Sequence, residues 1–161
     1  MKSVQARLNN WSGTSAQPSL TDGQWNMAMA AGVILMVMAV LQVIGFSDFK
    51  DTLNGIGLTS NPALWAVLIL VAEVWGALGF FKIRLNNLGR MLSGLFALSV
   101  SFFWFYESLK LVSEGLAGQL TNSGFFGKYL QQSPGWWTVL EASVFLFWIL
   151  YVVKLTWAKN K

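Results

Sequence analysis

The chain of 161 residues contains no cysteine and no histidine. Without a thiolate or an imidazole it lacks the usual ligands of zinc, haem and iron–sulfur clusters, so no metal site is expected. Nucleophile–base couples of the Cys–His and Ser–His types are excluded for the same reason. Dithiol–disulfide exchange is excluded as well, because it needs two cysteines. No catalytic residue can be assigned, and the sequence favours a protein that is not an enzyme.

Charged side chains are also scarce. They make up 11% of the chain, whereas hydrophobic residues make up 55%. A soluble domain carries about 25% charged residues. The net charge is +4, but the cations are not clustered as they are in a phosphate-binding surface, so no nucleic-acid partner is expected. The composition predicts one membrane domain, with the lipid bilayer as its first partner.

Four apolar segments are each long enough to cross a bilayer, which takes about 20 residues. Their hydrophobic residues run continuously and do not alternate, so helices are the spanning form and not strands of a barrel. The sequence therefore predicts an all-α membrane protein, a four-transmembrane-helix bundle, with helices over residues 27–46, 63–81, 88–112 and 136–157.

The predicted membrane domain covers residues 27–158, between a polar arm at residues 1–26 and a basic tail at residues 159–161. Positive residues concentrate on the cytoplasmic side of membrane proteins. Lysine and arginine gather in the arm, the second connection and the tail, which predicts that both termini are cytoplasmic and that residues 47–62 and 113–135 are outside. These cations are Lys2, Arg7, Lys82, Arg84, Arg90, Lys154, Lys159 and Lys161.

Small residues recur at helical spacing in the second and third apolar segments. In lipid, helices associate where small side chains let their backbones approach closely. We therefore predict that these small-residue stripes are packing seams of the helix bundle. Their residues include Gly76, Gly89, Ser93, Ala97 and Ser101.

Glu73 is the only acid in the second apolar segment and lies roughly 15 Å from its outer end. A charge near the bilayer midplane costs about 2.5–3.5 kcal/mol, so this side chain should face the bundle interior. Gly76 and Ala77 lie on the same helix face. Two readings stay open: a proton or quinone-headgroup site, and a neutral acid bonded to a neighbouring helix.

Glu141 lies about 7.5 Å into the last apolar segment. It either approaches Glu73 or stays near the outer interface, where an acid suits the start of a helix that Ser133 would cap. Glu107 and Lys110 have the spacing of an ion pair, expected at the outer end of the third segment.

Five tryptophans fall near predicted helix ends, where indole rings favour the membrane interface. Interfacial anchoring is the expected role of Trp25, Trp65, Trp136, Trp137 and Trp157.

The segment Asn122-Ser123-Gly124-Phe125-Phe126-Gly127 resembles the Asn-Cys-Gly-Cys-Phe-Gly loop of the MauE/DoxX-like family of four-helix membrane proteins. Ser123 and Phe125 stand where that family has its two cysteines. The tryptophans and the acid that follow the loop, Trp136, Trp137 and Glu141, and the helix that carries Glu73, extend the resemblance over about residues 27–157.

The resemblance implies a bacterial cytoplasmic-membrane protein associated with thiol–disulfide exchange, quinone-linked electron transfer or the maturation of redox enzymes. A hydroxyl at Ser123 and a phenyl ring at Phe125 cannot form a disulfide, so the thiol chemistry does not carry over. What remains is the shape of the loop. Phe125 and Phe126 would then contact the membrane surface or a partner, or simply anchor a glycine turn.

Three functions compete. The favoured one is a non-catalytic membrane subunit, or an assembly or stabilising factor, of a larger bioenergetic or redox complex. Nine Trp, twelve Phe and three Tyr would pack against larger membrane subunits, since interfaces are rich in aromatics. The alternative is a quinone- or lipid-binding component of an oxidoreductase, with Glu73 and Glu141 around the headgroup. A small transporter or channel is disfavoured, because the apolar segments hold few polar residues.

Overall fold

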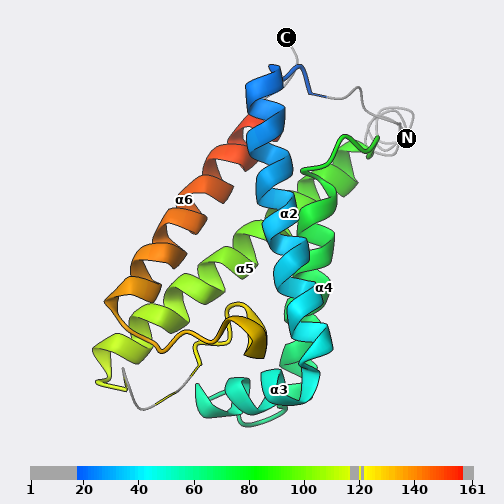
Figure 1. The fold of residues 1–161 in the computed structure, drawn as a ribbon. Coiled ribbons are helices and arrows are strands. Elements are labelled where there is room, and N and C mark those ends of the chain that lie inside the picture. The colour runs from blue at the N-terminus through cyan, green and yellow to red at the C-terminus, as the bar shows by residue number, and fades with distance from the viewer. Residues whose placement is uncertain (1–17, 117–119, 121, 158–161) are drawn as a thin grey trace, which may run out of the picture.

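The computed structural model describes residues 18–116, 120 and 122–157 (Figure 1). Most of the predicted polar arm and the whole basic tail therefore lie outside the described residues. The described part contains five α-helices and one short 3-10 helix, η1. Their bounds are α2 Asp22–Ile44, α3 Phe46–Gly55, α4 Pro62–Leu78, α5 Asn87–Ser113, η1 Gly127–Leu130 and α6 Trp136–Trp157.

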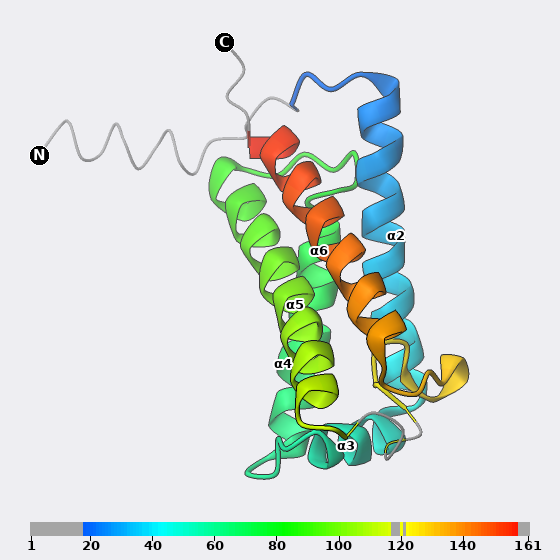
Figure 2. The same ribbon diagram turned by 90° about the vertical axis from the view of Figure 1, so that its left-hand side faces the viewer.

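The predicted all-α class is confirmed. Helices α2, α5 and α6 are each long and apolar enough to cross a membrane, and α4 is a shorter apolar helix of 17 residues. These four helices run lengthwise beside one another, and α3 lies across one end of them (Figures 1 and 2). We call this the α3 end. The opposite end, where α2 begins and α6 finishes, is the terminal end.

The helix bounds follow local capping signals. Helix α2 starts five residues earlier than predicted, because Thr21 and Gln24 form a capping box: each side chain accepts from the backbone N–H of the other. Helix α4 begins at Pro62 behind the cap of Asn61. It stops at Leu78, three residues before the predicted end. Helix α6 spans the residues predicted for it.

Helix α3 was not predicted; the sequence analysis placed its residues in a connection. It is amphipathic: Phe49 and Leu53 are buried beneath it, whereas Asp48 and Asp51 are exposed. Ten residues are too few to cross a bilayer. The helix therefore covers the end of the bundle.

The predicted seam lies between α4 and α5. A Cβ on Gly76 would lie 2.9 Å from the backbone nitrogen of Ala97, so the two helices are in backbone contact there. The Ser93 hydroxyl donates to the Gly76 carbonyl at 2.8 Å and accepts from the N–H of Gly79 at 2.8 Å. These two bonds serve backbone groups at the end of α4.

The hydrogen bonds of Ser101 and Gly89 stay local. Ser101 is fully buried, and its hydroxyl donates to the carbonyl of Ala97 in the same helix at 2.7 Å. The N–H of Gly89 donates to the cap residue Asn86 at 2.7 Å. The direct contacts between α4 and α5 shown above therefore involve Gly76, Ser93 and Ala97.

The tryptophans divide between surface and core. Trp136 and Trp137 are 72% and 63% exposed at the α3 end, where the start of α4 also presents Trp65. Trp157 lies at the terminal end and packs on Gly94. Trp25 differs from the expectation of an interfacial anchor: only 7% of it is exposed, and it belongs to the hydrophobic core.

Candidate functional site

Glu73 is fully buried at the meeting point of three helices. It projects from the face of α4 that also carries Gly76 and Ala77, the side turned to the other helices. Its Oε1 accepts a hydrogen bond from Nε2 of Gln42 on α2, at 3.1 Å, and from Nε1 of Trp104 on α5, at 3.3 Å. Its Oε2 has no hydrogen-bond partner within the described residues.

Gln42 connects this carboxyl to the loop that precedes α6. Its side chain is fully buried, and Nε2 donates both to Glu73 and to the backbone carbonyl of Phe125, each at 3.1 Å. Its Oε1 is a second buried oxygen to which the described part of the chain offers no donor. We call Gln42, Glu73, Trp104 and Phe125 the Glu73 cluster.

The loop owes its shape to two glycines and one asparagine. Gly124 and Gly127 have φ values of +84° and +63°, which side chains other than glycine rarely adopt. Asn122 brackets the turn, because its Oδ1 accepts from the N–H of Gly124 and its Nδ2 donates to the carbonyl of Gly127, both at 3.0 Å. Asn122, Gly124 and Gly127 therefore fix the backbone of this turn.

Aromatic contacts hold the loop inside the bundle. The Phe125 ring lies 5.5 Å from the ring of Trp104, 4.9 Å from Phe126 and 5.9 Å from Phe145, between ring centroids. A Cβ on Gly124 would be 3.3 Å from the Trp104 ring. Phe125 is thus a core residue and does not contact the membrane surface.

Ser123, two residues before Phe125, is buried too. Its N–H donates to the carbonyl of Gln132 at 2.8 Å, while its hydroxyl finds no partner in the described residues. Neither position presents a side chain at the surface where an exchange partner would reach it.

Glu141 is not part of the Glu73 cluster. It is half-buried on α6, and the structure shows no hydrogen bond or ion pair to it from the described residues. The predicted cap is also different: at the start of α6, Thr138 Oγ1 accepts from the N–H of Gly135 at 3.0 Å, whereas Ser133 is exposed.

The predicted Glu107–Lys110 pair forms, with 3.6 Å between Nζ and Oε2. Its surroundings differ from the expected open interface, because Glu107 is buried. Lys110 also donates to the carbonyl of Ile56 at 3.1 Å, which ties α5 to the segment after α3.

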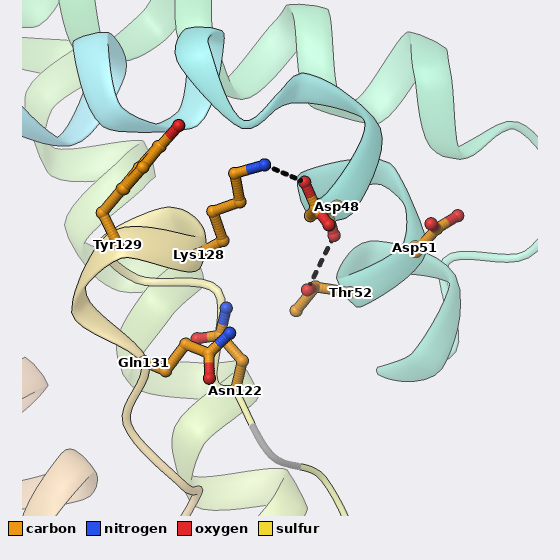
Figure 3. Close-up of a pocket in the computed structure, with 7 residues that line it drawn as sticks. All are labelled: Asp48, Asp51, Thr52, Asn122, Lys128, Tyr129 and Gln131. Carbon is orange, nitrogen blue, oxygen red and sulfur yellow. Dashed lines mark hydrogen bonds and ion pairs between the residues drawn. The ribbon is translucent and has the colours of Figure 1, made fainter.

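A second feature, which the sequence did not reveal, is a polar hollow of about 340 Å³ at the α3 end (Figure 3). Lys128 Nζ lies 2.9 Å from Asp48 Oδ2 across it. This hydrogen-bonded ion pair lowers the pKa of the Asp48 carboxyl and raises the pKa of Lys128. Eighty residues separate the two partners, so no local spacing announces the pair. The hollow is lined by Asp48, Asp51, Thr52, Asn122, Lys128, Tyr129 and Gln131.

The Glu73 cluster offers an acid, an amide and an indole N–H, none of which is a strong nucleophile. Its chemistry is therefore hydrogen bonding and the binding or release of a proton. Neither a protein-family model nor a curated protein nor a solved structure matches this chain significantly.

Proposed function

We propose that α2, α4, α5 and α6 span a bilayer with both termini in the cytoplasm, and that the protein is a non-catalytic subunit or assembly factor of a larger bioenergetic or redox membrane complex. It keeps a MauE/DoxX-like scaffold without the dithiol. The charges support this orientation: the α4–α5 connection carries Lys82 and Arg84, whereas Lys128 at the α3 end is neutralised by Asp48.

The observation that carries the proposal is that the protein's own side chains make the hydrogen bonds of the Glu73 cluster. Both donors to Glu73 come from the protein, and none of its surface is exposed. An acid that serves a substrate needs a path to it, whereas one that joins three helices and a loop stabilises a scaffold. The polar hollow does not reach Glu73.

The outer face of α6 suits contact with larger apolar partners. Its exposed side chains repeat every three or four residues, so they form one continuous stripe along the helix. Aromatic side chains are enriched at protein interfaces and also suit lipid. The stripe consists of Trp136, Leu140, Val144, Phe147 and Tyr151.

Extraction of the tagged chain from its native membrane tests the proposal. In mild detergent the chain should migrate on a native gel as part of an assembly larger than its own 17.9 kDa. Phe147→Ala should weaken that assembly more than Phe102→Ala, the same truncation on the exposed face of α5. A monomer that performs a complete activity alone would contradict the subunit role.

One observation favours a second candidate, a quinone-binding component of an oxidoreductase. Glu73 Oε2 and Gln42 Oε1 are buried oxygens without partners in the described residues, and a protonated Glu73 would offer a donor to a quinone carbonyl. Glu73→Gln should then abolish bound quinone or quinone-dependent activity, because an amide cannot pass on the proton. If the variant leaves both unchanged, the quinone candidate fails.

A further inference from the structure

The polar hollow between α3 and the loop carries charges of both signs. Lys128 reaches across from the loop to Asp48, while Asp51 projects from the next part of α3 (Figure 3). Two carboxylates and one ammonium leave one net negative charge. The exposed Gln131 amide borders the same space from the loop side. A ligand that fits this pattern carries an anionic and a cationic group a few ångströms apart.

The hollow adjoins an apolar helix face. A Cβ on Gly45, the residue after α2, would lie 3.2 Å from Cγ of Lys128, so the lysine stem rests on the end of α2. The outward face of α2 leads to this point with five exposed aliphatic side chains at helical spacing. They are Val33, Val37, Val40, Val43 and Ile44.

The same end of the molecule has the side chains of a membrane interface. Tyr129 and Leu130 are 53% and 55% exposed beside the hollow, and the exposed indoles of Trp65, Trp136 and Trp137 lie at the same end. Indole and phenol rings prefer the level of the lipid headgroups. The hollow therefore lies where a headgroup would be, at the end of a stripe that acyl chains would cover.

We propose that the hollow binds the headgroup of a phospholipid with a primary amine, of the phosphatidylethanolamine type. Lys128 receives the phosphate, the carboxylates of Asp51 and Asp48 accept from the ammonium, and an acyl chain lies along the α2 stripe. The net negative charge disfavours anionic headgroups. A choline headgroup lacks the N–H donors that two carboxylates would accept from. This site is independent of the proposed membership of a complex.

Lipid retention by the full chain tests the proposal. The protein is equilibrated in detergent with equal amounts of phosphatidylethanolamine and phosphatidylcholine of matched acyl chains, and bound lipid is counted by native mass spectrometry. We expect about fivefold preference for phosphatidylethanolamine, since exposed ionic contacts each contribute up to about 1 kcal/mol. Lys128→Gln and Asp51→Asn should each remove most of this preference.

Lys50→Gln is the matched control, because it removes one charge from α3 at a residue that does not line the hollow. The Lys50 ammonium lies instead over the Phe46 ring, 5.6 Å from its centroid. Asp51 is outside the Asp48–Lys128 pair, so Asp51→Asn still tests the site if Lys128→Gln loosens the loop. Equal retention of the two lipids, or equal effects of Asp51→Asn and Lys50→Gln, overturns the proposal. Preferred binding of phosphatidylglycerol overturns it too. If soluble phosphoethanolamine competes as well as the lipid, the ligand is a free zwitterion and the lipid assignment is wrong.

Discussion

At the scale of single residues, Glu73 behaves as a hydrogen-bond acceptor shared by two donors. Glutamine preserves that role, because its Oε1 accepts from Gln42 and Trp104 as the carboxyl does. We expect Glu73→Gln to change the free energy of unfolding by less than about 1 kcal/mol, whereas Glu73→Leu removes the acceptor of Trp104 and one of the two acceptors of Gln42 and costs about 1–3 kcal/mol. Thermal unfolding in detergent compares the two. Equal losses would show that the cluster does not depend on an oxygen at this position.

A second prediction at this scale concerns Gln42, because its side chain donates hydrogen bonds both to the carboxyl and to the loop. Gln42→Leu removes one donor from Glu73 and the donor to the Phe125 carbonyl. We expect a loss of about 1–3 kcal/mol and faster proteolysis within residues 120–132. Gln131→Leu, which replaces an exposed amide, is the control. It should change neither the free energy of unfolding nor the rate of proteolysis. Cleavage at the same rate in both variants would contradict the tether.

At the scale of elements, the α4–α5 seam sets the tightest packing limit. Gly76→Ala places a methyl group 2.9 Å from the Ala97 nitrogen and 3.0 Å from its Cα, where only the backbone can yield. We expect a loss of about 1–3 kcal/mol in unfolding free energy. Gly23→Ala is the matched control, since nothing lies within 4 Å of the added methyl group in the first turn of α2. A Gly76→Ala protein as stable as the control would argue against this seam.

The contact between α3 and η1 depends on pH. The pKa of Asp48 lies below its ordinary 3.8, and the pKa of Lys128 lies above its ordinary 10.5. The stabilisation is therefore complete between these two values. It is lost as the pH falls through the folded pKa of Asp48 or rises through that of Lys128. The protection factors of the η1 amides against hydrogen exchange, which correct for the slower intrinsic exchange in acid, should fall on acidification below pH 3.8.

Asp48→Asn is the variant that tests this pH dependence. It should raise exchange in η1 at neutral pH and remove the further acid response, whereas Asp22→Asn, at the other end of the molecule, should do neither. An acid response that persists in Asp48→Asn would assign the effect to another group.

The four apolar helices were predictable because each is a long continuous apolar run. Helix α3 was missed for the opposite reason: it lies in a segment that is polar on average, and its apolar side is small. That side consists of Phe46, Phe49 and Leu53, with Ile56 directly after the helix. The spacing of these residues by three or four is a helical signal that a search for spanning segments does not detect.

The loop illustrates a different limit of sequence reasoning. A glycine turn was one of the roles expected for this segment, and the structure has such a turn, to which Asn122 adds two hydrogen bonds. That Phe125 faces inward depends on Trp104 and Gln42, which lie on helices far away in sequence and provide the ring contact and the donor. Glu73 was expected to face the bundle interior, but its partners were not identifiable from a single chain.

At the scale of the whole molecule, the Glu73 cluster and the polar hollow lie on either side of the loop that precedes α6. On its inner side the loop is bonded to the Glu73 cluster, and on its outer side Lys128 closes the polar hollow against α3. A change in the cluster can therefore alter the shape of the hollow. The loop keeps its position without any disulfide, through backbone geometry, aromatic packing and two side-chain contacts.

The membrane topology is the last prediction, and the chain is well suited to test it because it has no native cysteine. Single cysteines at Ser60, Ser133 and Ile83 place unique labels in three connections, at positions that the structure exposes. With α2, α4, α5 and α6 all crossing, Ser60→Cys and Ser133→Cys lie on one side and Ile83→Cys on the other. The positive residues around Ile83 assign that side to the cytoplasm.

A membrane-impermeant maleimide added outside intact cells or spheroplasts should label Ser60→Cys and Ser133→Cys. It should spare Ile83→Cys until the membrane is permeabilised. Labelling of Ser60→Cys but not Ser133→Cys would mean that α4 and α5 do not both cross, and the hollow, built from α3 and the loop before α6, could not then lie at one membrane surface.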